Sequence, residues 1–164
     1  MNAGSALRAF VLLGGVFLGT AASGQDLQTF ADRAASGNRF ELVSSQLALG
    51  FAQDDEVRAF AEMLMTDHTA AAEKMGAAAE ADGITPTAGI SEMQQARLNE
   101  LENLTGERFD TAYVDAQLTA HDDAVALFRS FAASDEESAL RDFAQQALPV
   151  LEQHQEQVRS LATR

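Results

Sequence analysis

The clearest structural signal in the chain is the stretch ELVSSQLALGFAQDDEVRAFAEMLMTDH, residues 41–68. Apolar residues recur three and four positions apart on both sides of a polar triplet, Gln53-Asp54-Asp55, which is the period of an amphipathic helix. Asp54, Asp55 and Glu56 place negative charge at the start of the second segment, where the helix dipole favours it. The stretch therefore predicts two antiparallel helices joined by a tight turn.

The same helical period extends outward from this hairpin over almost the whole chain, and no stretch alternates apolar and polar residues as strands do. Capping residues, glycines and Pro86 indicate where the helices end. The expected helices are 26–52 with Asp26 as N-cap, a second running to Ala81, a short one over 91–103, a third long one over 107–133, and a fourth that follows a capping box at 134–137 and runs to Leu161. Pro149 lies inside the last helix and predicts a kink or a break there.

Four long helices with two tight turns and one longer connection predict an all-α, antiparallel four-helix bundle of the ferritin-like kind. The short extra helix falls in the crossover between helices two and three. The segment Val57–Ala61 resembles Leu140–Ala144, and this echo has two interpretations. Either two helical hairpins are related by pseudo-symmetry, as in ferritin-like bundles, or Ala-rich amphipathic helices look alike by chance.

The N-terminus has the pattern of a secretory signal peptide over residues 1–24. Arg8 precedes a short apolar run, 9–18, and a tail of small residues ends at Gly24. The run is shorter than the roughly 20 apolar residues that a membrane-spanning helix needs, so cleavage is expected and an uncleaved anchor is the alternative. The prediction is a periplasmic or secreted protein whose folded domain is 25–164, with no later membrane span.

The charge of the mature chain is strongly acidic. Removing residues 1–24 removes one arginine and leaves 10 basic against 25 acidic residues, a formal net charge of about −15. Such a surface repels phosphate backbones, so no nucleic-acid partner is expected. The chain has no cysteine, no Gly-x-Ser-x-Gly motif and no phosphate-binding glycine loop, so hydrolase and nucleotide-enzyme functions have no support.

The three histidines each lie on the apolar face of a different predicted helix. His68, His121 and His154 have apolar neighbours three, four and seven positions away, which directs each imidazole toward the core. Helix one contributes Glu41 instead. Counted from the turn at Gln53, Glu41 and His68 are level, whereas His121 and His154 are about six residues out of level, roughly 9 Å at the α-helical rise.

One glutamate and three histidines from four helices could bind a transition metal, since imidazole suits zinc, copper, iron or nickel. A di-iron centre is not expected, because it needs Glu-x-x-His on two helices and the residues three before the histidines are Met65, Leu118 and Leu151. The alternative is a buried hydrogen-bond network without metal. Asp67, beside His68, could orient a neighbouring imidazole or simply be solvated.

Two groups of motifs resemble a family of exported bacterial proteins named domain of unknown function 4142 (DUF4142). They are Phe30 to Leu49, Val57-Arg58-Ala59-Phe60-Ala61, Met65 and Asp67-His68 in the first half, and Gly106-Glu107-Arg108-Phe109-Asp110, Tyr113, His121, Phe128, Leu140-Arg141-Asp142-Phe143-Ala144, Leu148-Pro149-Val150-Leu151 and His154 in the second. The resemblance implies a ferritin-like fold and an envelope location, but no activity. It marks Glu41, His68, Asp110, His121 and His154 as motif positions.

The functional prediction is a non-enzymatic, surface- or stress-related envelope protein that works by binding or by stabilising an assembly. An envelope protein or a second copy of the chain is the expected partner. The alternative is a metal-binding or redox protein that uses Glu41, His68, His121 and His154, with an unidentified transition metal as cofactor. A role at a membrane surface is disfavoured by the acidic charge, because such helices are rich in Lys and Arg.

Overall fold

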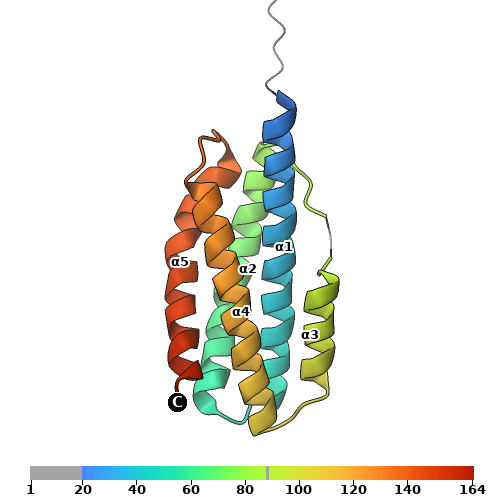
Figure 1. Ribbon diagram of the computed structural model, residues 1–164, viewed down its shortest axis with the longest axis vertical. Helices are drawn as coiled ribbons and strands as arrows, with labels where there is room; N and C mark the ends of the chain where they lie inside the picture. Colours follow the sequence, from blue (N-terminus) through green and yellow to red (C-terminus); the bar gives the residue numbers. More distant parts are fainter. Residues whose placement is uncertain (1–19, 88) are drawn as a thin grey trace, which may run out of the picture.

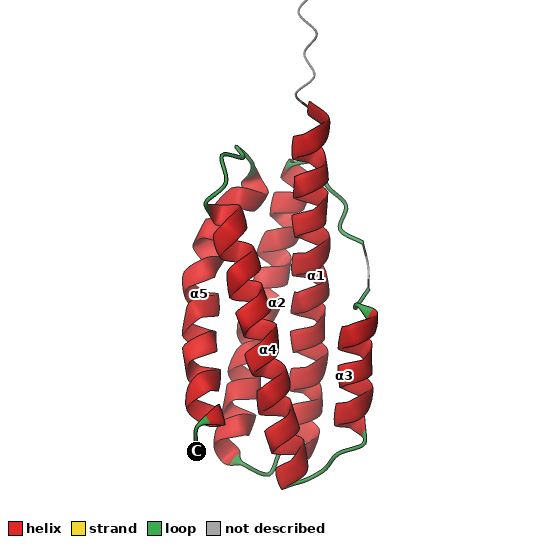
Figure 2. Ribbon diagram, viewed as in Figure 1, coloured by secondary structure: helices red, strands yellow, loops and turns green. Residues whose placement is uncertain are grey.

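The helical period of the sequence corresponds to five helices in the computed structural model, which describes residues 20–87 and 89–164 (Figure 1). They are α1 (Thr20–Phe51), α2 (Asp55–Ala81), α3 (Glu92–Glu102), α4 (Glu107–Ala132) and α5 (Ala139–Ala162). The described ranges contain helices and loops but no strand (Figure 2). The expected all-α class is confirmed.

The four long helices form a bundle. Along the chain, α1 and α2 make one hairpin and α4 and α5 make another, and the pairs α2–α5 and α1–α4 also pack together, which closes a ring of four helices. The short helix α3 lies outside this ring against α1 and α4 (Figure 1). The extra helix is therefore in the predicted crossover, while the assignment to ferritin-like bundles stays a prediction.

The turn of the first hairpin is held by side chains from both sides. Asp54 is the N-cap of α2, and its carboxylate accepts hydrogen bonds from the backbone N–H groups of Glu56 and Val57. Arg58 donates to two carbonyls at the end of α1. The buried carboxylate of Asp110, from α4, accepts from the N–H groups of Gln53 and Asp54. Asp110 thus anchors the α1–α2 turn to α4, which is a structural task.

The start of α5 differs from the prediction. The expected capping box at residues 134–137 does not form, because the Ser134 hydroxyl donates back to the Phe131 carbonyl. The N-cap is Ser138, and the carboxylate of Asp82, which ends α2, accepts from the N–H groups of Ala139 and Leu140. A contact across the bundle therefore sets this helix terminus, and local sequence could not reveal it.

We expect Asp82→Ala to destabilise the protein by about 1 kcal/mol, because loss of a capping carboxylate typically costs 0.5–2 kcal/mol. The matched control is Asp135→Ala, an exposed acid in the α4–α5 loop, which should change the free energy of unfolding by less than about 0.5 kcal/mol. Urea denaturation followed by circular dichroism measures both. Equal losses of stability in Asp82→Ala and Asp135→Ala would contradict the role of Asp82 as a cap of α5.

Two other predictions are corrected. Helix α1 begins at Thr20, so Asp26 lies inside the helix and is not its N-cap; the alanines at positions 21 and 22 favour helix and extend it upstream. Helix α5 continues through Pro149, so the break that was one of the two expected effects of this proline does not occur, while a kink there stays a prediction. Residues 1–19 of the predicted signal peptide lie outside the described residues. Within the described part, none of the helices combines the length and the hydropathy that crossing a membrane requires.

The hydrophobic core is divided in two. One apolar cluster surrounds Leu64, Phe109 and Tyr113, and the other surrounds Phe30 and Phe143 near the opposite end of the bundle. Neither cluster contains any of the buried polar side chains. Apart from Asp110 at the α1–α2 turn, these side chains form one layer to which all four long helices contribute: Glu41, Ser44, Ser45, His68, Gln117, His121 and His154. A bundle of this size could fill its interior with apolar residues, so this polar layer requires an explanation.

Candidate metal centre

The polar layer contains all four residues that the sequence marked as candidate ligands. Each long helix supplies one side chain: Glu41 from α1, His68 from α2, His121 from α4 and His154 from α5. All four are buried, with exposures of 0–5%. The amphipathic pattern of each helix turns these side chains inward, and the bundle brings them together at one level.

Glu41 and His68 are level, as the count from the turn predicted. The Oε2 atom of Glu41 lies 2.7 Å from Nε2 of His68 and 3.3 Å from Nε2 of His121. Burial alone would raise the pKa of Glu41, but the charges of His68 and His121 outweigh burial and lower it to about 2. Burial likewise opposes the charge of His68, yet the neighbouring Glu41 raises the pKa of this imidazole overall. The two side chains form a buried ion pair.

The predicted stagger of His121 and His154 is wrong. Their ring centroids are 5.6 Å apart, and those of His68 lie 6.0 Å from His121 and 5.5 Å from His154. One ring nitrogen from each histidine lies within 4.8 Å of the others. Part of the error lies in the reference point: α4 ends at Ala132 and α5 begins at Ala139, so His121 and His154 lie 11 and 15 residues from the ends of their helices, a difference of four residues and not six.

The second nitrogen of each imidazole is occupied by a partner outside the cluster. Nδ1 of His68 lies 2.9 Å from Oδ1 of Asn38, and Nδ1 of His121 lies 2.9 Å from the Gln117 carbonyl. Nε2 of His154 lies 2.9 Å from Oδ2 of Asp67. A carbonyl or carboxylate oxygen here can only accept, so the outer nitrogens carry the protons. Metal-binding histidines characteristically use this arrangement, which aims the other nitrogen at the ion.

The atoms that face inward have no hydrogen-bond partner among the described residues. They are Glu41 Oε2, His68 Nε2, His121 Nε2 and His154 Nδ1. The 2.7 Å contact between Glu41 Oε2 and His68 Nε2 compensates these two atoms as an ion pair, which leaves His121 Nε2 and His154 Nδ1 unsatisfied. Leaving a buried polar atom unpaired costs about 1–3 kcal/mol. Two unsatisfied nitrogens beside this ion pair fit a group that the cluster would share, and one cation could accept electron pairs from all four side chains.

The residues next to the cluster form a conventional hydrogen-bonded network. The Gln117 amide donates to the Ser44 hydroxyl at 2.7 Å, and Ser45 shares a 2.9 Å hydrogen bond with Tyr113. Burial raises the pKa of Tyr113, so its hydroxyl stays protonated. This network supports the cluster from the Leu64 side of the core. The network is satisfied except at Gln117 Oε1, which has no hydrogen-bond partner among the described residues.

Sequence reasoning missed two of the outer partners. The partner of His121 is the backbone carbonyl of Gln117, four residues earlier in α4, which any residue at that position would supply, so the sequence carried no signal for it. Asn38 carried no signal either, since its reach to His68 depends on how α1 packs against α2. Asp67 was considered as an orienting group for a neighbouring imidazole, and the structure places it on His154 of α5.

Comparison with known proteins places the chain by family and by fold. A protein-family model with the description "Domain of unknown function (DUF4142)" matches residues 18–161. No curated protein matches the sequence. Among solved structures, the chain is similar to a DUF305 fragment from Deinococcus radiodurans, with 18% identity and a TM-score of 0.71 over 88% of this chain and 97% of that one.

A second solved structure is similar to a comparable degree. It is a DUF305 protein from Streptomyces coelicolor, described as a candidate secreted protein, with 13% identity and a TM-score of 0.70 over 83% of this chain and 89% of that one. At these identities the likeness shows a shared helical fold. It carries no information about a ligand.

Proposed function

The chain belongs to the family described as Domain of unknown function (DUF4142), and from this premise we propose that it is an exported binding protein whose ligand is one transition-metal ion. Glu41, His68, His121 and His154 are its proposed ligands. The observation that carries the proposal is the convergence of three buried histidine nitrogens from three helices within 4.8 Å of one another, beside the buried carboxylate of Glu41 from the fourth. Export is supported by the signal-peptide pattern of residues 1–24.

The dimensions of the cluster suit a single ion. Zinc–nitrogen bonds are about 2.0–2.1 Å, so two nitrogens on one ion are at most about 4.2 Å apart. The three histidine nitrogens, within 4.8 Å of one another, need only a small inward shift of their side chains. Imidazole nitrogens with one carboxylate favour zinc and copper(II) over magnesium or calcium, and the usual order of affinities places copper(II) highest.

Ferritin-type iron chemistry is not part of the proposal, although a ferritin-like arrangement of the four long helices is. A di-iron centre takes a Glu from each of two helices and Glu-x-x-His from two more. Glu41 is the one acid that the described residues place against two of the histidines, and Asp67 contacts the outward nitrogen of His154. The donor set is thus three imidazoles and one carboxylate, which matches a mononuclear site.

The direct test is metal titration of the purified protein after dialysis against a chelator. We expect one zinc or copper(II) ion per chain by calorimetry and by elemental analysis. Ligand present at about 1,000 times its Kd stabilises a folded protein by about 4 kcal/mol, so the bound ion should also raise Tm clearly. Absence of tight binding, with no change in Tm, would favour a polar layer that only fixes the packing of the helices.

A further inference from the structure

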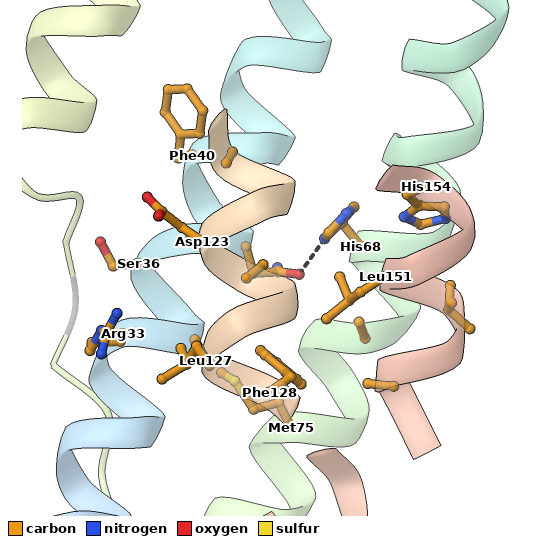
Figure 3. A pocket seen from close by; sticks show the side chains of 18 of the residues that line it. Arg33, Ser36, Phe40, His68, Met75, Asp123, Leu127, Phe128, Leu151 and His154 are labelled. Carbon is orange, nitrogen blue, oxygen red and sulfur yellow. Dashed lines mark hydrogen bonds between the residues drawn. The ribbon is translucent and has the colours of Figure 1, made fainter. Parts of the chain in front are cut away.

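A cavity of about 550 Å³ lies against one side of the histidine layer (Figure 3). His68 and His154 line it together with large apolar side chains that include Met75, Phe128 and Leu151. Glu41 and His121 do not line it. The proposed metal centre therefore has one face toward the cavity, formed by His68 and His154, and another face closed by protein.

The cavity exists because every long helix presents small residues at this level. The lining includes Gly37 from α1, Ala71 from α2, Ala124 from α4 and Ala147 from α5. A Cβ atom added at Gly37 would meet nothing within 4 Å. The cavity is open to solvent on one side, where the exposed side chains of Met93 and Val150 belong to its lining. Its volume lies in the range of about 300–1,000 Å³ that is typical of small-molecule sites.

A second observation distinguishes this space from loose packing. His154 is 2% exposed and lines the cavity, and its Nδ1 has no hydrogen-bond partner among the described residues. The Asp67 carboxylate holds the opposite nitrogen of the same ring, so Nδ1 presents a lone pair. A buried nitrogen held in this orientation points to a ligand, whether that is the proposed ion or a molecule bound with it.

Basic and acidic side chains both line the cavity, so the lining favours neither an anionic nor a cationic occupant. The basic residues on its lining are Arg33, Lys74 and Arg97, and the acidic ones are Asp32, Asp67 and Asp123. Arg33 and Asp123 lie on the side away from His68 and His154 (Figure 3), and the carboxylate of Asp67, which is near the histidines, is already paired with Nε2 of His154. A charged group buried without a partner of opposite charge is strongly disfavoured. The occupant that fits is therefore neutral and mostly apolar.

We infer that the cavity binds a neutral, mostly apolar small molecule whose single nitrogen or oxygen donor reaches the metal ion between His68 and His154. This inference rests on the proposed function, since the ion supplies the polar anchor. The apolar body lies against Met75, Phe128 and Leu151, and the donor takes the coordination position that faces the cavity. The protein would then recognise a molecule through its shape and one donor atom.

The test compares two azole probes on copper-loaded protein. 4-Phenylimidazole carries a neutral donor and an apolar ring, whereas imidazole carries the donor alone. We expect calorimetry to show 4-phenylimidazole binding at least about tenfold more tightly, because the phenyl ring is removed from water. The visible absorption of copper should shift with both probes. Elemental analysis after gel filtration checks that the ion stays on the protein.

Two matched variants locate the binding. Ala124→Leu fills the cavity and should abolish the preference for the phenyl ring while one copper ion still binds per chain. Ala126→Leu, on the exposed face of the same helix, should leave the preference unchanged. If Ala124→Leu fails to fold, Ala147→Leu on α5 fills the cavity from another side.

The outcomes separate the two proposals. If copper does not bind, the proposed metal centre fails and the inference fails with it. If copper binds but both probes bind equally, or the preference survives in the cavity-filling variant, only the inference is overturned. If the preference for 4-phenylimidazole over imidazole disappears in Ala124→Leu and persists in Ala126→Leu, the inference is supported.

Discussion

Replacement of His121 by alanine is expected to weaken binding of zinc or copper(II) by more than about 100-fold, because loss of an outer-shell partner alone costs roughly 10–100-fold. His121 is fully buried, its Nδ1 is held by the Gln117 carbonyl, and its Nε2 lies 3.3 Å from Glu41. Calorimetric titration of the chelator-treated variant measures the loss.

A graded series makes this prediction specific. Asp67→Asn removes the charge that orients His154 but keeps the ligand, so affinity should fall by roughly 10–100-fold, less than for His121→Ala. Asp122→Ala is the control, because Asp122 is exposed beside His121 and its carboxylate bonds outward to Gln155 and Arg159. Metal affinity that is unchanged in His121→Ala, or reduced equally in Asp122→Ala, would contradict the proposed ligand set.

Replacement of Glu41 by leucine is expected to destabilise the metal-free protein by about 3 kcal/mol, since breaking a buried ion pair by removing one partner costs roughly 3–5 kcal/mol. The change leaves the His68 imidazole buried without its counter-charge. We expect the lower end of that range, because His68 can release its proton. Urea unfolding in the presence of a chelator measures the effect and makes it independent of any metal.

The double variant Glu41→Leu/His68→Leu gives the sharper result. Replacing both members of a buried ion pair by apolar residues of similar volume is often neutral or stabilising. The double variant should therefore be more stable than Glu41→Leu alone. Glu62→Leu, on the exposed face of α2, should change stability by less than about 0.5 kcal/mol. If the double variant were destabilised by the sum of the losses measured for Glu41→Leu and His68→Leu, the two side chains would not be a coupled pair.

The successes of the sequence analysis came from short distances along the chain. Glu41 and His68 could be paired because a tight turn of known length separates two straight helices, and counting from it is then reliable. The four helix faces could be assigned because the apolar period is strong. Both inferences use only local geometry, the twist and rise of a helix.

The failures came from contacts between distant segments. The start of α5 is capped by Asp82 of α2, 57 residues before Ala139, and the misplaced start contributed to the false stagger of His121 and His154. The cavity was invisible for the same reason. Each alanine and glycine that lines it is ordinary within its own helix, and only the packing of four helices places them at one level.

The division of the core into two apolar clusters bears on how the protein unfolds. Cooperative unfolding requires that the two ends of a bundle lose their structure together, and the packing energy that links them normally runs through a continuous core. Here that link passes through the polar layer. Without a bound ion, amide exchange at the two ends can proceed as separate local openings. An ion held by all four helices would join the two halves into one exchange unit.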